Sequence, residues 1–302
     1  MASEGTYYVP EQSRLPIFAS LGLGSMAFGI AGWINGGSAT IFLVGSLIMA
    51  VVLWCWFSVV INENMAGLND AQLKRSYVWG MGWFIFSEVM FFAAFFGALY
   101  YIRNLALPWL SGEGSNATTN SVLWSGFVAD WPLMITPDMA VNGDAAKVVG
   151  PGQNMSVTTA ESIWTWLPFW NTAVLLTSSV TVHMAHTALK NNIRKAFNIW
   201  LGITVALGMI FVALQIAEYS HAYHVGLTLE TGVYGTTFFM LTGFHGAHVT
   251  IGTFMLLVMW LRSVVKGHFT HDDCFGFESA SWYWHFVDVV WVGLFIFVYI
   301  LG

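Results

Sequence analysis

Charged side chains are scarce in this sequence. Only 9% of its 302 residues are Asp, Glu, Lys or Arg, whereas soluble domains contain about 25%. So few charges cannot cover a water-facing surface, which excludes a soluble globular protein. The remainder is 57% hydrophobic and 17% aromatic. The composition therefore predicts an integral membrane protein.

Other features are missing as well. The two cysteines, Cys55 and Cys274, fall in an apolar run and in a distant polar loop, which excludes a disulfide framework. No HExxH or CxxC spacing occurs. There is no internal repeat and no pair of short, Gly- or Pro-broken helices of the transporter kind. The N-terminal stretch MASEGTYYVPEQSRLP has neither signal-peptide nor transit-peptide character, which favours a bacterial or organelle-encoded protein without a cleaved leader.

Long apolar runs are plentiful. A membrane-spanning helix needs roughly 20 apolar residues, and backbone polar groups in lipid must be satisfied within the segment. The sequence therefore predicts an all-α polytopic membrane protein with seven transmembrane helices. The predicted spans are 17–34, 40–61, 77–102, 163–189, 197–219, 234–261 and 280–301.

The basic residues predict the orientation, because Lys and Arg concentrate on the cytoplasmic side. Eight of the ten lie at the N-terminus or in even-numbered loops: Arg14, Lys74, Arg75, Lys190, Arg194, Lys195, Arg262 and Lys266. Only Arg103 and Lys147 lie in the third loop, together with five acidic residues. The N-terminus is therefore expected inside and the C-terminus outside.

The third loop, about 103–162, is the only long polar segment and is rich in Gly, Ser, Asn and Thr. Structureless loops of this length are uncommon and are usually functional or disordered. Two interpretations remain open: a surface cap over the helix ends, or a docking site for a partner.

Ionisable residues inside membrane spans are rare and are candidates for functional sites. Seven are present: Glu88, His183, His186, His245, His248, His285 and Asp288. Glu218 is close to the outer end of its span and is expected at the membrane interface. Three of the groupings have i,i+3 spacing, which places both side chains on one helix face.

The histidine pairs have three possible roles. Imidazole is a common metal or haem ligand, but a metal site needs three or four converging donors. Polar side chains also join neighbouring helices by hydrogen bonds, and a proton relay is the third possibility. The spacing favours packing without excluding the other two.

Depth arithmetic suggests a partner for Glu88. Glu88 lies thirteen residues after Arg75, roughly 20 Å from the inner boundary at about 1.5 Å per residue. His248 lies fourteen residues before Arg262, at about 21 Å by the same rule. A histidine at matching depth can hold the carboxylate ionised or share its proton. We therefore expect a Glu88–His248 pair.

Three blocks resemble one known family. They are SEVMFFAAFFGALY (87–100), GVYGTTFFMLTGFHGAHVTIG (232–252) and HFT…FGFESASWYWHFVDVVW (268–291). All three resemble subunit III of cytochrome c oxidase, in the A-type haem–copper terminal oxidase family. The likeness is close over the last five spans and loose over the first two.

The resemblance implies an organisation. Two N-terminal helices (17–61) are splayed from a five-helix bundle (77–302), with phospholipid in the V-shaped cleft between them. Residues 1–16 are a cytoplasmic tail. The resemblance also implies no catalytic residue, metal or other redox cofactor in this subunit, because haem and copper belong to subunits I and II. The subunit supports proton uptake and the stability of the active site.

The resemblance also implies roles for individual residues. Glu88 matches the family's buried, carbodiimide-reactive glutamate, and His248 matches the second histidine of its Gly-Phe-His-Gly-x-His motif. Four positions match lipid-headgroup contacts: Trp56, Glu63, Arg262 and His268. A departure is Ser58, which stands where the family often has an arginine, so one phosphate contact is in doubt.

These observations predict an accessory subunit of a proton-pumping oxidase in a bacterial inner membrane. Its expected partners are subunits I and II, phospholipids, and a c-type cytochrome or accessory subunit at the 103–162 loop. No nucleic acid is expected. The alternative is a freestanding seven-helix proton-coupled transporter or channel that uses Glu88 and the midplane histidines.

Overall fold

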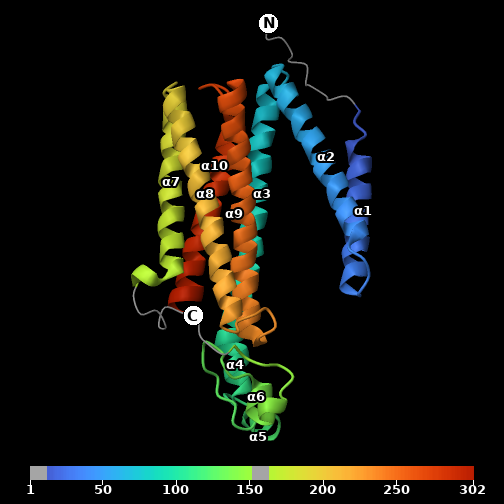
Figure 1. The fold of residues 1–302 in the computed structure, drawn as a ribbon, viewed down its shortest axis with the longest axis vertical. Helices are drawn as coiled ribbons and strands as arrows, with labels where there is room; N and C mark the ends of the chain where they lie inside the picture. The colour runs from blue at the N-terminus through green and yellow to red at the C-terminus, as the bar shows by residue number, and fades with distance from the viewer. Residues whose placement is uncertain (1–11, 152–162) are drawn as a thin grey trace. The chain divides into compact units, whose positions relative to one another are not determined.

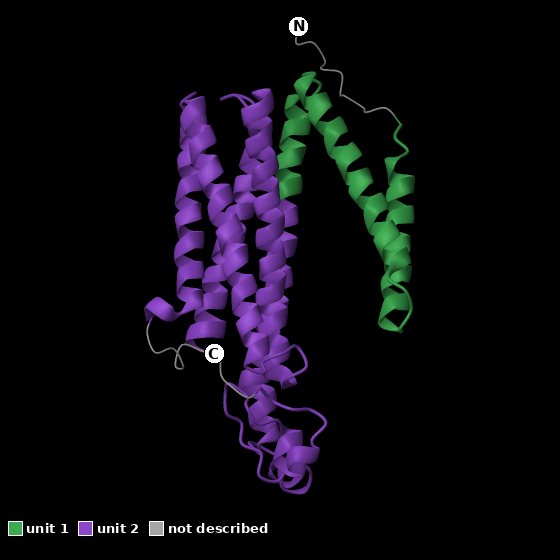
Figure 2. Cartoon of the chain, in the orientation of Figure 1, with its two compact units in different colours: residues 1–81 green, residues 82–302 purple. Residues whose placement is uncertain are grey.

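The computed structural model describes residues 12–151 and 163–302, and the chain divides into two compact units, residues 1–81 and 82–302 (Figures 1 and 2). All regular secondary structure in the described ranges is helical, which confirms an all-α protein. The boundary between the units falls within helix α3 (Ala71–Tyr101). Each unit is described by itself.

The first unit contains a helical hairpin. Helix α1 (Leu15–Ile34) and helix α2 (Thr40–Met65) are joined by a five-residue connection, close to the predicted spans 17–34 and 40–61. Pro16 stands in the first turn of α1, where its missing N–H costs nothing. Gly36 has φ +85° in the connection, a left-handed conformation that glycine adopts without strain.

Small residues let α1 and α2 approach closely. Gly22 and Gly29 of α1 and Gly45 of α2 are buried. A Cβ added at Gly29 would lie 2.2 Å from the backbone nitrogen of Phe42, and one at Gly45 would lie 2.7 Å from that of Met26. Close backbone approach through small residues is how helices associate in lipid, where apolar burial gives no driving force.

The outer faces of the hairpin are apolar and exposed. Phe28 is 82% exposed and Trp54 is 75% exposed. Surfaces of this kind mark contact with a membrane or another protein, so the hairpin is built for an apolar surrounding.

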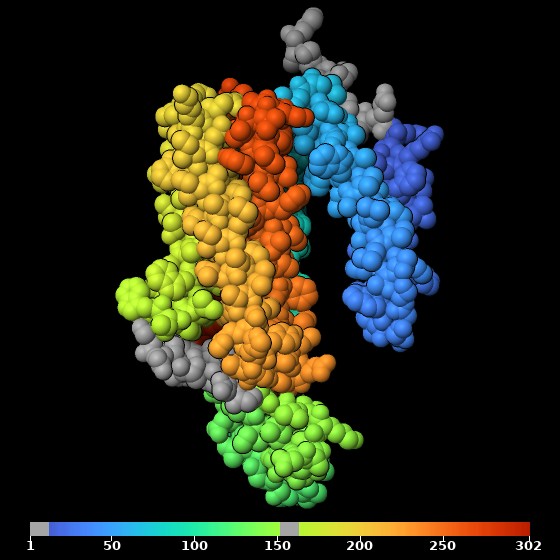
Figure 3. All heavy atoms as spheres, viewed as in Figure 1, coloured from blue at the N-terminus to red at the C-terminus, as the bar shows by residue number. Residues whose placement is uncertain are grey.

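The second unit is a bundle of long helices. Besides residues 82–101 of α3 it contains α7 (Leu167–Lys190), α8 (Arg194–His224), α9 (Gly232–Lys266) and α10 (Phe275–Leu294), which continues as the π-helix η5 (Phe295–Ile300). Figure 3 shows α8 and α9 packed side by side along one face. In the most apolar 18-residue stretch of α10 with η5, 56% of the residues are buried, whereas the corresponding share for α3 is 11%. Helix α10 therefore lies at the centre of the bundle.

The core of the bundle is aromatic, and the indole N–H groups of its tryptophans form hydrogen bonds to a neighbouring helix. Trp284 and Trp291 of α10 are fully buried. The Trp284 indole N–H donates to Ser178 Oγ, and that of Trp291 donates to Thr172 Oγ1, both at 2.9 Å. A buried Trp N–H needs such an acceptor. The Ser- and Thr-rich helix α7 supplies these acceptors.

Six helical segments are long and apolar enough to cross a membrane, in the part of the chain that the structure describes. They are α1, α2, α3 with its continuation to Leu110, α8, α9 and α10 with η5. Helix α7 has 24 residues, but its Ser, Thr and His residues reduce its hydropathy, and it is not among the six. The predicted number of seven spans is therefore supported for six and not confirmed for the fourth.

The third loop carries helices of its own. Helix α3 continues through the π-helix η1 (Ile102–Ala106) into α4 (Leu107–Leu110), followed by α5 (Ala117–Leu123), α6 (Pro137–Asn142) and the 3₁₀ turns η2 (Gly143–Ala145) and η4 (Ile163–Thr165). Residues 152–162 of the expected loop lie outside the described ranges. The described part of the loop therefore contains regular helical structure.

One carboxylate organises the end of this segment. Asp138 accepts hydrogen bonds from the backbone N–H groups of Lys147 at 2.5 Å and Val148 at 2.9 Å, and from the Asn142 side chain at 2.7 Å. Chiefly the Val148 and Asn142 bonds hold the pKa of Asp138 below its usual value, because these donors favour the charged form. The segment closes on itself around this side chain.

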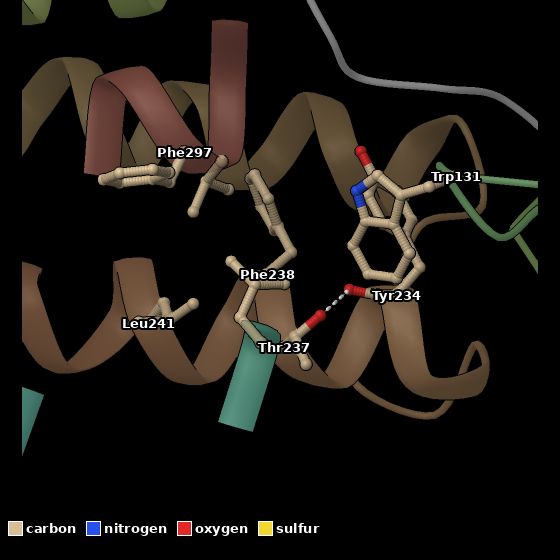
Figure 4. A pocket seen from close by; sticks show the side chains of 8 residues that line it. Trp131, Tyr234, Thr237, Phe238, Leu241 and Phe297 are labelled. Carbon is tan, nitrogen blue, oxygen red and sulfur yellow. Dashed lines mark hydrogen bonds between the residues drawn. The ribbon is translucent and has the colours of Figure 1, made fainter. Parts of the chain in front are cut away.

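The folded loop is joined to the bundle through Arg103 and Trp131. The Arg103 guanidinium donates to the carbonyl of Leu301 and lies 5.8 Å from the centre of the Trp131 ring. Trp131 in turn meets Tyr234 of α9 edge-on at 5.4 Å. Trp131, Tyr234 and Phe297 line a cavity of about 10 Å³ at this junction (Figure 4), which is space for roughly one water molecule.

We predict that Gly45→Ala destabilises the α1–α2 hairpin by about 1–3 kcal/mol, the usual cost of overpacking. The control is Gly24→Ala on α1, because an added Cβ there meets nothing within 4 Å and should be neutral or slightly stabilising. The free energy of unfolding in mixed detergent micelles measures both. Equal stability of the two variants would contradict the close approach.

Candidate functional site

Glu88 of α3 and His248 of α9 lie in hydrogen-bonding contact. Glu88 Oε2 is 2.9 Å from His248 Nε2. The other ring nitrogen, Nδ1, lies 2.6 Å from the carbonyl oxygen of Phe244, one turn earlier on α9. The depth arithmetic had placed the two residues at the same level, and the structure brings their side chains together.

The Phe244 carbonyl fixes the number of protons in this pair. A carbonyl can only accept, so His248 Nδ1 carries a proton. Nε2 then either accepts from a protonated Glu88, or donates to an ionised Glu88 as part of an imidazolium. Both forms are electrically neutral as a pair. The arrangement can therefore stay in an apolar region without an uncompensated charge, and one proton can shift between its two atoms.

Aromatic rings surround the pair. Phe92 meets the His248 ring edge-on at 5.0 Å, and Tyr283 stacks on it at 6.3 Å. The His248 side chain is 13% exposed and that of Glu88 is 23% exposed. The carboxyl is therefore held against the bundle but reachable from its outer face.

The remaining intramembrane histidines point to different partners. His245 is fully buried, and its Nε2 lies 3.2 Å from the carbonyl oxygen of Val287. His285 Nδ1 lies 3.0 Å from Ser179 Oγ and 3.5 Å from Asp288 Oδ2. His183 is exposed on α7. His245 and His285 thus have different partners, and the three side chains do not converge on one centre.

In the described residues no group of three or more His, Cys, Asp or Glu side chains could hold a metal ion. The His245–Val287 contact joins α9 to α10, and the His285–Ser179 contact joins α10 to α7. These two contacts are hydrogen bonds between helices, which is the role that the i,i+3 spacing of the histidines favoured.

A charged cluster at the N-terminal end of α10 was not predicted. Glu278 Oε1 lies 2.8 Å from Lys190 Nζ and 3.1 Å from His186 Nε2. Lys190 Nζ also lies 3.3 Å from Cys274 Sγ. Sequence reasoning had treated His186 as a possible ligand and had not considered Glu278, although the i,i+4 spacing of His186 and Lys190 on α7 places both on one helix face.

Glu218, which the sequence placed at the membrane interface near a helix end, is buried inside the bundle. In the structure α8 continues six residues beyond it to His224, and Glu218 is only 2% exposed. It is a core residue of the bundle.

Two of the proposed lipid positions, Arg262 and His268, lie together. Arg262 Nε is 3.4 Å from His268 Nδ1, and the guanidinium lies 4.6 Å from the centre of the Phe269 ring. Arg194 binds the carbonyl oxygens of His268 and Phe269 at 3.0 and 2.7 Å. Burial, followed by the charges of Arg262 and Lys266, lowers the pKa of His268. At neutral pH the positive charge here comes from the arginines and Lys266 rather than from His268.

The other two proposed lipid positions belong to the first unit. Trp56 and Glu63 lie on α2, and Trp56 is 53% exposed. Ser58 donates to the carbonyl of Trp54 within the same helix at 2.7 Å. The Ser58 hydroxyl is thus turned back onto its own backbone.

Comparison with known proteins identifies the family. The family model described as Cytochrome c oxidase subunit III matches residues 5–109 and 153–302. A protein of Danio rerio named Cytochrome c oxidase subunit 3 is 36% identical over 297 residues, covering 98% of this chain and 97% of the relative. Proteins of the same name from Formosania lacustris and Latimeria chalumnae are 35% and 36% identical over the same shares.

The chain belongs to the cytochrome c oxidase subunit III family. The family model passes over residues 110–152, which contain most of the folded third loop. That segment, defined as residues 110–152, is called the insertion below. The relatives come from vertebrates, so they give no support to the predicted bacterial source.

We predict a measurable energetic coupling between Glu88 and His248. A double-mutant cycle with Glu88→Ala and His248→Ala should give a coupling of about 0.6–1.7 kcal/mol, the range for polar pairs between membrane helices. The readout is the free energy of unfolding in mixed micelles. The control cycle, Glu88→Ala with the exposed His183→Ala, should be additive. A Glu88–His248 coupling no larger than the control would contradict the pair.

Proposed function

We propose that this chain is the accessory subunit III of a proton-pumping cytochrome c oxidase, a complex of the aerobic respiratory chain that reduces oxygen to water. The observation that carries the proposal is the family match over nearly the whole length of both chains. The same match gives no support to a freestanding transporter. Haem and copper belong to the partner subunits in this proposal, and this subunit carries out no redox step.

In the proposed arrangement the chain crosses the membrane seven times, with α7 as the fourth span. Neighbouring helices cover its Ser and Thr residues, as the Trp291–Thr172 bond illustrates, so a low hydropathy does not prevent it from spanning. The α1–α2 hairpin forms a two-helix part beside the five-helix bundle. The exposed apolar faces of the hairpin are suited to phospholipids between the two parts.

The proposed orientation has the N-terminus in the cytoplasm and the C-terminus in the periplasm of a bacterium. Eight of ten basic residues on one side support this orientation. The insertion supports a bacterial source, because the family resemblance implies a shorter loop in mitochondrial forms.

Arg262 and His268 are proposed to hold a lipid phosphate at the inner boundary, with Trp56 and Glu63 as further lipid contacts. The Phe269 ring and the His268 side chain position the Arg262 guanidinium. A guanidinium fixed in this way can bind two phosphate oxygens at once. Arg194 donates hydrogen bonds to two backbone carbonyls and so holds the loop that contains His268.

Glu88 is proposed to join α3 to α9 and to lie beside lipid, away from the redox centres. Its neutral pair with His248 explains how a carboxyl is kept in this position, and its partial exposure explains how a lipid-soluble reagent would reach it. Proton relay is the second candidate role. The shared proton on the Glu88–His248 axis is the observation that favours it.

Subunit I is the proposed main contact, with subunit II. The insertion is proposed to contact a c-type cytochrome or an accessory subunit. Between residues 110 and 151 it carries Glu113, Asp130, Asp138 and Asp144 against one basic residue, Lys147. Such an excess of negative charge attracts a basic partner by electrostatic steering.

Purification through a tag on this chain in mild detergent tests the assignment. We expect the haem- and copper-bearing subunits and phospholipid to co-purify, and the chain to lose all haem absorption once these subunits are removed. A haem band retained by the isolated chain would refute the proposal.

A variant lacking residues 112–150 should keep the redox subunits and lose affinity for the electron donor or one small subunit. If neither is lost, the insertion is not a docking site.

Arg262→Ala should lower the affinity for bound phospholipid about fivefold, since a basic residue near a lipid headgroup contributes about 1 kcal/mol. It should also hasten inactivation during turnover. Lys266→Ala removes an exposed basic residue one turn away on the same helix and should have a smaller effect, because the Phe269 ring and His268 position Arg262. Unchanged lipid content in Arg262→Ala would contradict this role.

Glu88→Gln should leave the initial turnover largely intact. Loss of most of the turnover in an assembled Glu88→Gln complex would contradict the role proposed for Glu88.

A further inference from the structure

His183 presents an imidazole on the outer surface of α7 that forms no hydrogen bond or ion pair in the described part of the chain. The residue is exposed, and the Thr187 hydroxyl donates to its backbone carbonyl, at 3.1 Å, rather than to its ring. His183 lies seven residues before Lys190, where α7 ends, which is roughly 10 Å along the helix axis. In a membrane span formed by α7, this imidazole therefore lies well inside the apolar region.

His285 of α10 presents a second imidazole beside α7. Its Nδ1 lies 3.0 Å from Ser179 Oγ and 3.5 Å from Asp288 Oδ2, whereas its Nε2 has no hydrogen bond among the described residues. The side chain is 41% exposed. Ser179 and His183 are four residues apart on α7 and share one helix face. The two imidazoles therefore flank the same stretch of the contact between α7 and α10.

Apolar side chains lie next to the two imidazoles at helical spacing. Val180, three residues before His183, is 59% exposed, and Val289, four residues after His285, is 71% exposed. Two further exposed apolar residues precede them by one turn or two. We define the α7–α10 face as Leu176, Val180, His183, Trp282, His285 and Val289. Apolar area that carries a few polar groups in this way is typical of a surface that packs against protein.

The outer surface of α8 has a different composition. Between residues 199 and 217 of α8, every exposed residue is Ile, Met or Ala. Such a surface is fully compatible with lipid chains. Ionisable side chains in membrane spans, by contrast, almost always face protein or water rather than lipid. The α7–α10 face is therefore distinguished from the lipid-compatible surface of the same bundle by its two imidazoles.

We propose that the α7–α10 face is the docking surface for a membrane-spanning helix of a neighbouring subunit of the complex, which gives hydrogen-bond partners to His183 and to Nε2 of His285. Directional bonds of this kind specify which helices associate in a membrane. The inference rests on the proposed function, because it takes α7 as a membrane span and other subunits as neighbours. It also explains the low hydropathy of α7, since protein then covers both its inner and its outer face.

The charges beside this face are already balanced within the chain. Glu278 Oε1 lies 2.8 Å from Lys190 Nζ, and Asp288 lies beside His285. An additional carboxylate or ammonium group from the partner would be left without a counter-charge in the apolar region, which is costly. The docking helix therefore carries neutral hydrogen-bonding side chains, such as Ser, Thr, Asn or Gln, opposite the two imidazoles.

Photo-crosslinking in the assembled complex tests the docking surface. A benzophenone amino acid is placed at Val180, at Val289 or, as the control, at the exposed Ile203 of α8. Val180 lies ten residues before the end of α7 and Ile203 nine after the start of α8, so the two have similar depth. We expect the first two positions to link to a membrane-spanning helix of one neighbouring subunit, identified by mass spectrometry, and position 203 to link to lipid.

Variants of His183 test the hydrogen bond itself. His183→Leu should lower the retention of that subunit at rising detergent concentration by about threefold, the size expected for one polar contact between membrane helices. His183→Gln should retain most of the binding, because its amide still donates and accepts. Thr187→Val is the control and should have no effect, because the Thr187 hydroxyl is bonded to its own helix.

Labelling of lipid alone from positions 180 and 289 would overturn the proposal. Equal cross-linking from Ile203, or cross-links to a second copy of this chain, would overturn it as well, and so would equal retention in His183→Leu and Thr187→Val. If the redox subunits still co-purify in these cases, the proposed function stands and only the docking surface is wrong. A complex without the redox subunits would overturn the proposed function and this inference with it.

Discussion

A carboxyl group in a membrane-spanning bundle must be kept electrically neutral, and much of the polar architecture of this chain follows from that constraint. Isolated charge in an apolar medium costs far more than any packing contact returns. The chain meets the constraint in several ways. Glu88 is hydrogen-bonded to His248, so the pair can be neutral as a whole. Glu278 lies beside Lys190 and His186. Glu218 is buried in the core near the Tyr299 hydroxyl.

These contacts also define which helices belong together. The Glu88–His248 contact joins α3 to α9, and the Glu278–Lys190 contact joins α10 to α7. The indole bonds of Trp284 and Trp291 run from α10 to α7 as well. Hydrophobic burial cannot specify helix pairs when the solvent is itself apolar, so directional bonds and close backbone approach must do so. The α1–α2 hairpin has few directional bonds between its helices and relies on close backbone approach at glycines such as Gly29 and Gly45.

The sequence allowed the helices and the Glu88 partner to be predicted for a physical reason. Apolar run length is set by membrane thickness, and a constant rise per residue converts position into depth. Glu88 and His248 could therefore be matched without knowing how the helices pack. The family motifs added an identity that depth arithmetic cannot supply. Helix α7 was predicted from the same apolar pattern, but its hydropathy alone does not establish a span.

Lateral arrangement could not be obtained in this way. Glu278 meets Lys190 across 88 positions of sequence, and only the packing of α7 against α10 makes them neighbours. The level of Glu218 near the end of α8 could be read from the sequence, but its burial inside the bundle could not, because burial depends on packing. The insertion was read from composition as a loop, yet Asp138 ties three donors into one fold. In each instance the decisive partner lies outside the local sequence window, so a one-dimensional pattern fixes how deep a side chain lies but not what it faces.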